Sequence, residues 1–114
     1  MTDLINTAIQ PEKAIMVGLI TSKEDNQKVD EYLDELAFLI ETAGGIPEKR
    51  FIQKLKFIDP KTFVGKGKLD EIREYVIAEN IDLAVFDDEL SPSQLRNIEN
   101  VLGCKILDRN NLIL

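Results

Sequence analysis

Residues 81–107, IDLAVFDDELSPSQLRNIENVLGCKIL, decide the fold class because they combine an apolar strand, an amphipathic helix and a second strand. The pattern predicts a strand over 81–86, a helix over 92–102 and a strand over 104–107, with Gly103 closing the helix. A strand, a helix and a strand in this order form a crossover between parallel strands.

The start of this helix follows local capping rules. Ser91 suits the N-cap, Pro92 suits the first helical position, and Gln94 stands where a capping box places Glu or Gln. Asp88 and Glu89, just upstream, favour the positive end of the helix dipole. Capping and solvation therefore account for most of this acidic turn.

Asp87 and Asp88 also lie at the carboxyl end of a predicted strand, where open α/β sheets bind ligands. A magnesium site there is the alternative to capping. A phospho-receiver domain would need further acids after the first strand, but that strand runs into Thr21-Ser22-Lys23. Capping and solvation stay the favoured interpretation.

Arg96 and Asn97 are not explained by capping. We expect a structural role, in which they tie the helix over 92–102 to Asp87, to Asp108 or to the loop before the helix.

The same alternation of elements extends toward the N-terminus. Apolar runs and periodicity predict a strand over 14–20, a helix over 27–43, a strand within 46–58 and a helix over 68–80. This pattern predicts an α/β fold, a three-layer sandwich with a mainly parallel four-stranded sheet, crossover helices and strand order 2-1-3-4. The predicted domain spans 13–114 and follows an N-terminal arm over 1–12.

Composition narrows the function classes. The 114 residues, 44% of them hydrophobic, suit one domain with a real core, and they include no histidine, which excludes Ser-His-Asp, Cys-His and His-rich zinc sites. The single cysteine, Cys104, is expected to be a buried strand thiol and fits a reducing cytoplasm. Neither a signal peptide nor a membrane-spanning apolar run is visible.

Charge is unevenly distributed along the chain. The net charge is −7, yet residues 49–73 hold eight basic residues against three acidic ones, a balance of +5, which leaves −12 for the remainder. One basic segment in an acidic protein favours a polyanion contacted by one face. The alternative is a lysine-rich, solvated edge strand.

The stretch Gly65-Lys66-Gly67-Lys68 precedes a predicted helix, and free backbone N–H groups with two ammonium groups can hold a phosphate. The spacing is neither that of a P-loop nor that of a dinucleotide-binding motif. A mononucleotide pocket and a flexible loop approaching a phosphate backbone both fit this pattern.

Three stretches resemble the N-terminal domain of the HflX family of ribosome-associated GTPases. They are FVGKGKLDEI at 63–72, DLAVFDDELSPSQLRNIE at 82–99 and ILDRNNLIL at 106–114. The matching motif residues are Gly65 to Lys68, with the set Leu90, Ser91, Pro92, Gln94, Arg96, Asn97, Glu99, Asp108 and Arg109.

The resemblance implies partners and cofactors that composition does not show. Members of this family carry an α/β domain, then a helical region and a P-loop GTPase domain that uses GTP and magnesium. They bind the large ribosomal subunit, where the N-terminal domain reaches ribosomal RNA, and act in ribosome splitting or rescue. This sequence contains no GTPase motif, so no catalytic residue, metal or cofactor is expected within it.

The expected function is therefore an RNA-facing module of a cytoplasmic GTP-binding protein, with its own helical and GTPase domains as further partners. The residues expected to contact phosphates or approach the RNA backbone are Lys54, Lys56, Lys61, Gly65, Lys66, Gly67 and Lys68. Two alternatives stay open, an ATP-binding domain and a platform that regulates the GTPase domain.

Overall fold

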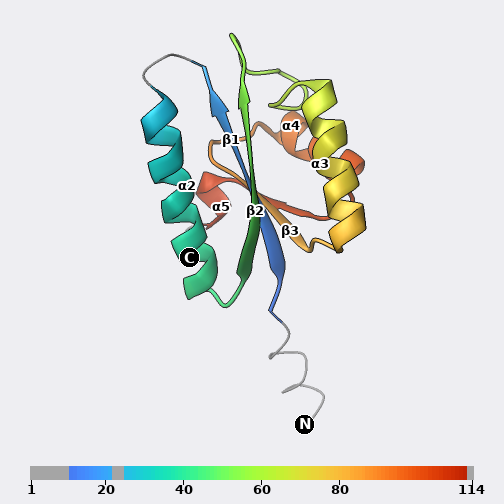
Figure 1. Cartoon of the computed structure of the whole chain (residues 1–114). Helices are drawn as coiled ribbons and strands as arrows, with labels where there is room; N and C mark the ends of the chain where they lie inside the picture. The colour runs from blue at the N-terminus through green and yellow to red at the C-terminus, as the bar shows by residue number, and fades with distance from the viewer. Residues whose placement is uncertain (1–10, 22–24, 113–114) are drawn as a thin grey trace.

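A four-stranded parallel sheet forms the middle layer, with helices on both faces (Figure 1). The computed structural model describes residues 11–21 and 25–112, so most of the predicted N-terminal arm over 1–12 lies outside the described part. The described elements, in chain order, are β1 (Lys13–Ile20), α2 (Asp25–Thr42), β2 (Ile46–Lys54), α3 (Lys66–Glu79), β3 (Leu83–Phe86), α4 (Pro92–Leu102), β4 (Lys105–Leu107) and α5 (Arg109–Leu112).

The predicted fold class and strand order are confirmed. The sheet has the order β2-β1-β3-β4, and each neighbouring pair is parallel. The helix predicted over 92–102 has these same bounds, whereas α3 begins at Lys66, two residues before the predicted start. The short helix α5 was not predicted, because four residues carry no helical periodicity.

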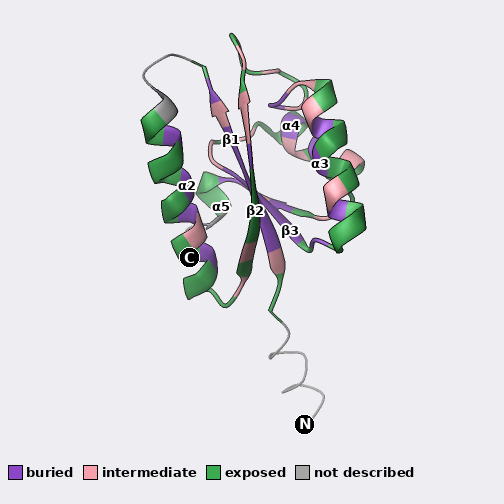
Figure 2. Ribbon diagram, viewed as in Figure 1, coloured by how far each residue is buried: buried purple, intermediate pink, exposed green. Residues whose placement is uncertain are grey.

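β1 owes its continuous apolar sequence to burial on both faces. Ile15 and Val17 pack in the cluster on the side of α3 and α4, and Ala14 and Met16 pack in the cluster on the side of α2. Successive side chains of a strand point to opposite faces, so a central parallel strand has no wet side. Figure 2 shows this burial along the centre of the sheet.

β2 lies at an edge of the sheet and is mostly exposed, with Phe51 as its buried residue. This edge position explains why β2 does not carry the continuous apolar sequence of β1. Pro47 and the charged residues at 48–50 lie on this edge, where they oppose pairing with another strand.

The parallel strands place their carboxyl ends at one edge of the molecule. The connection from β2 to α3, residues 55–65, and the turn from β3 to α4, residues 87–91, both begin there (Figure 1). In the described part of the chain, no helix is long and apolar enough to cross a membrane.

Candidate functional site

Exposed lysines gather on the connection from β2 to α3. Lys54 ends β2, Lys56 and Lys61 lie on the connection, and Lys66 begins α3. All four residues are exposed, and their ammonium groups have no hydrogen bond or ion pair with any residue in 11–21 or 25–112. We call these four residues the carboxyl-edge lysines, because the topology brings them to the edge where the parallel strands end.

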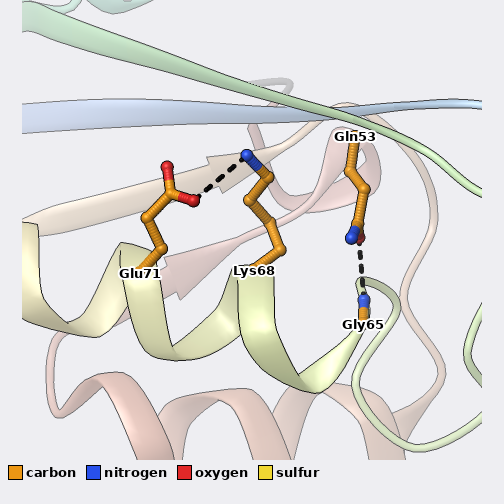
Figure 3. A network of polar contacts seen from close by, with 4 residues as sticks. All are labelled: Gln53, Gly65, Lys68 and Glu71. Atoms are coloured by element: carbon orange, nitrogen blue, oxygen red, sulfur yellow. Dashed lines mark hydrogen bonds and ion pairs between the residues drawn. The ribbon is translucent and has the colours of Figure 1, made fainter.

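Lys68 differs from the carboxyl-edge lysines. Its side chain is only 21% exposed, and its Nζ lies 3.4 Å from Oε1 of Glu71, one turn further along α3 (Figure 3). Lys68 is therefore partly neutralised inside the molecule, and of the predicted phosphate contacts it is the least available.

Not all basic residues of the segment 49–73 are available to a ligand, because some of them make contacts inside the protein. Arg50 pairs with Asp34 of α2, and the Nζ of Lys49 lies 5.8 Å from the ring centre of Phe51 and 5.7 Å from that of Tyr75. These two cations serve contacts within the protein. The carboxyl-edge lysines are left facing solvent.

The backbone of the Gly65–Lys68 stretch is less open than its glycines suggested. The Gly65 N–H donates to Oε1 of Gln53 at 2.8 Å, so this group is already occupied (Figure 3). Neither Gly65 nor Gly67 has a positive φ. A Cβ at Gly65 would lie 3.3 Å from Nε2 of Gln53, whereas one at Gly67 would meet open space. A side chain at Gly65 would thus require the end of the Gln53 side chain to shift slightly, and backbone freedom is required at neither glycine.

The second half of the connection is a turn held by several hydrogen bonds. The backbones of Asp59 and Phe63 exchange two hydrogen bonds, of 2.9 and 3.1 Å, and Oδ1 of Asp59 accepts from the N–H groups of Lys61 and Thr62. Phe63 is 1% exposed and adopts φ 69°, an uncommon conformation for a residue with a Cβ. Its ring packs edge-to-face on Phe86, with 5.6 Å between ring centres.

Helix α4 fastens this turn from the side. Nε2 of Gln94 donates to the carbonyl of Asp59 at 2.8 Å, and Nδ2 of Asn97 donates to the carbonyl of Lys61 at 3.0 Å. Gln94 also completes the predicted capping box with Ser91, and Pro92 occupies the start of the helix as expected. The tie predicted for Asn97 exists, but its partner is the β2–α3 connection.

Arg96 does not take the predicted structural role. Its side chain is exposed, and within residues 11–21 and 25–112 it has no hydrogen bond or ion pair. Adjacent positions on a helix point about 100° apart, so Asn97 faces the connection while Arg96 faces solvent.

The acidic turn is held by residues that follow β4. Arg109 pairs with Asp87 at 2.6 Å, and the buried Asp108 accepts hydrogen bonds from the N–H groups of Leu90 and Asn111. Burial raises the pKa of Asp87 above its ordinary value, although the hydrogen bond from Arg109 opposes the rise. The same hydrogen bond raises the pKa of Arg109. Asp108 and Arg109 thus make the contacts that hold the acidic turn in place, a role that the sequence pattern predicted in part for Arg96.

A metal site at Asp87 and Asp88 has little support in this geometry. Asp87 is engaged by Arg109, and no group of three metal-binding side chains occurs within the described ranges. The Gly65–Lys68 stretch lacks P-loop spacing, so it does not fit the phosphates and magnesium of a bound GTP.

Cys104 lies just before β4 and is half-buried, so it is less enclosed than the predicted strand thiol. Burial, with a smaller contribution from Asp82, raises the pKa of its thiol to about 11. The thiol is therefore protonated at neutral pH and a poor nucleophile.

Comparison with known proteins gives a consistent family match. Residues 30–114 match the family described as "GTP-binding GTPase N-terminal". A protein named GTPase HflX from Flavobacterium psychrophilum is 54% identical over 103 residues, which cover 90% of this chain and 25% of that protein. The GTPase HflX of Escherichia coli is 36% identical, over 90% of this chain and 24% of its own length. The chain thus spans about a quarter of these relatives.

Solved structures agree on the fold. A crystal structure of a mutation variant of SsGBP matches with a TM-score of 0.65 at 23% identity, covering 90% of this chain and 30% of the other. At this identity the match supports the architecture alone.

Proposed function

The chain belongs to the HflX family of GTPases, and from this premise we propose that it is the RNA-contacting N-terminal domain of a GTP-binding protein that associates with the large ribosomal subunit. The full-length protein acts in ribosome splitting or rescue in the cytoplasm. GTP and magnesium are bound by its GTPase domain, whose motifs this chain does not contain.

The observation that carries this proposal is the set of carboxyl-edge lysines. Four exposed lysines whose ammonium groups have no partner in the described part of the chain lie on the β2–α3 connection and at its two ends, in a protein whose net charge is −7. Phosphate oxygens of RNA are the natural partners of such a set, because neutralising them releases condensed counterions. Contacts of this kind fix position on the nucleic acid and read no sequence.

The position of Lys66 supports an external anion. The first turn of α3 holds no acidic residue, and Gly65 provides no side-chain cap. A cation at the positive end of a helix dipole is unfavourable, typically by about 0.3–1 kcal/mol. Stability of the helix alone therefore does not explain why a lysine stands at its first position. Binding of an external phosphate at this end of the helix would explain it.

Fastening of the connection also supports the proposal. The hydrogen bonds from Gln94 and Asn97 hold the backbone at Asp59 and Lys61 in the free protein. A surface ordered before binding loses less conformational entropy when it meets a rigid partner. Large ribosomal subunits are such a partner.

Sedimentation with purified large ribosomal subunits tests the proposal. A variant carrying Lys61→Glu and Lys66→Glu should be recovered with the subunits at least ten times less than the wild-type chain, since two phosphate contacts become repulsive. The matched control carries Arg73→Glu and Lys105→Glu, which are also exposed and change the net charge equally, but lie away from the carboxyl-edge lysines. Equal recovery of the wild type and both variants would overturn the proposal.

A further inference from the structure

Phe57 stands out at the tip of the β2–α3 connection. Its side chain is 80% exposed, the largest value among the exposed large hydrophobic residues of the described chain, and its neighbour Ile58 is 43% exposed. A single exposed apolar residue is ordinary on a protein surface. The surroundings of Phe57 are what call for an explanation.

The backbone on both sides of this tip is anchored. Before it, the N–H of Leu55 donates to the carbonyl of Ile20 at 3.0 Å, and after it, the backbones of Asp59 and Phe63 bond to each other. Phe57 is therefore two residues from an anchored position in either direction. The protein holds this ring outward on a short, tethered tip, so ordering it on a ligand costs little entropy.

The charges around the tip are mainly positive. Lys54 and Lys56 precede Phe57 and Lys61 follows it. The one acidic residue in 54–61 is Asp59, and its Oδ1 accepts hydrogen bonds from the N–H groups of Lys61 and Thr62. An occupant of this surface must therefore offer a flat apolar face beside negative charge. An unpaired RNA base and its phosphate have this combination, and bases stack on exposed aromatic rings in single-stranded nucleic-acid binding.

We infer that Phe57 stacks on an unpaired base of the bound RNA while the neighbouring lysines hold the phosphates. The inference rests on the proposed function and adds to it the kind of RNA that is bound, a single-stranded or looped segment. A lipid surface also combines apolar and anionic groups, but its binding grows with buried apolar area, and this tip offers only Phe57 and Ile58.

Phe38 supplies an internal control. It is 67% exposed on α2, so it resembles Phe57 in exposure, but its neighbours along the helix include Asp34, Glu35 and Glu41. Stacking on RNA at Phe38 would bring phosphates toward carboxylates. The two rings therefore differ in charge environment and not in accessibility.

Tryptophan fluorescence tests the inference directly, because the chain contains no tryptophan. In the Phe57→Trp variant, a single-stranded adenine 12-mer RNA should quench the emission in a saturable way, and a duplex of equal length should quench it much less. The Phe38→Trp variant should show no saturable quenching. Equal quenching of Phe57→Trp by both RNAs would overturn the inference.

Affinity measurements keep the test independent of fluorescence. Phe57→Ala should weaken binding of the single-stranded probe by roughly 5- to 100-fold without changing the salt slope, because stacking is lost and no charge is removed. Phe57→Tyr should restore most of the affinity, and Phe38→Ala should leave it unchanged.

The outcomes separate this inference from the proposed function. If Phe57→Ala binds the RNA probe and large subunits as the wild type does, while the lysine variant binds neither, the inference falls and the proposed function stands. If the wild-type chain binds neither partner, the proposed function falls as well. Tighter binding to phosphatidylserine vesicles than to the RNA, with a blue shift of Phe57→Trp, would reassign the tip to a membrane.

Discussion

Two charged segments meet at the carboxyl edge of the sheet, and they use their charges in opposite ways. In the acidic turn over 87–91, Asp87 pairs with Arg109, and Asp108 receives the N–H of Leu90. On the β2–α3 connection, the carboxyl-edge lysines have no partner among the described residues. Side chains of the first segment hold the fold together, and those of the second are available to a ligand.

This difference shows that charge alone does not identify an interface. The acidic turn had one feature of a ligand site in the sequence, because Asp87 and Asp88 follow a strand at the end where α/β folds bind, but capping and solvation were the favoured interpretation. Internal partners account for it in the structure. Local capping and packing do not account for the exposed lysines, so those residues carry the functional proposal.

The largest expected effect on stability comes from Asp108. Replacing it with alanine leaves the N–H of Leu90 without its acceptor, in a place where Asp108 is 5% exposed. The N–H of Asn111 loses the carboxylate as well and keeps only the backbone carbonyl of residue 108. We expect Asp108→Ala to lower the free energy of unfolding by about 2–4 kcal/mol in urea titrations. Lys56→Ala should lower it by less than about 0.5 kcal/mol, and equal losses would erase the distinction between the two segments.

A smaller and pH-dependent effect is expected at Arg109. Its loss leaves Asp87, whose side chain is 6% exposed, without its cation, whereas Arg109 is 48% exposed and screened by water. We expect Arg109→Met to lower the free energy of unfolding at pH 7 by about 1–2 kcal/mol, below the cost of breaking a fully buried pair.

The pH dependence of that loss follows from the raised pKa of Asp87. Without Arg109 the pKa in the folded state rises further, so the folded protein holds a proton that the unfolded chain releases near the ordinary value of 3.8. The loss of stability in Arg109→Met should be largest at pH values above the pKa of Asp87 in the folded variant. The loss should shrink as the pH falls toward the ordinary pKa of the carboxyl group. A loss of stability that does not change with pH would contradict this explanation. So would an equal loss when Arg109→Met is introduced into the Asp87→Asn variant, which has no carboxylate at this position.

The smallest stability effect compares neighbours on α4. Asn97→Ser removes the hydrogen bond to the carbonyl of Lys61 at similar helix propensity and should cost about 1 kcal/mol. Arg96→Gln removes an exposed side chain without a partner in the described chain and should change the stability by less than about 0.5 kcal/mol. Thermal unfolding of both variants checks the order, and a larger loss for Arg96→Gln would restore its predicted structural role.

Local sequence rules predicted what local interactions determine. The bounds of α4 were right because Ser91, Pro92, Gln94 and Gly103 act within one or two turns of themselves. The strand order was right because alternating strands and helices permit few parallel windings.

Long-range features lay beyond those rules. Gln94 and Asn97 bond to carbonyls 35 and 36 residues earlier, and any residue supplies a carbonyl, so no side-chain pattern marks the partner. Phe63 adopts a positive φ that its residue type does not indicate, with its ring packed on Phe86. The fixed turn of the candidate site was therefore not visible in the sequence, whereas its lysines were.

The central claim is that the carboxyl-edge lysines contact phosphates, and the salt dependence of binding tests it most directly. The equilibrium constant of the chain for large ribosomal subunits would be measured from low to physiological salt, for the wild type and for a variant with all four lysines replaced by alanine. Each lost contact removes roughly 0.7–0.9 from the slope of log K against log salt, so the slope should flatten by about 3. Parallel slopes for the two proteins, with both folded, would contradict the account.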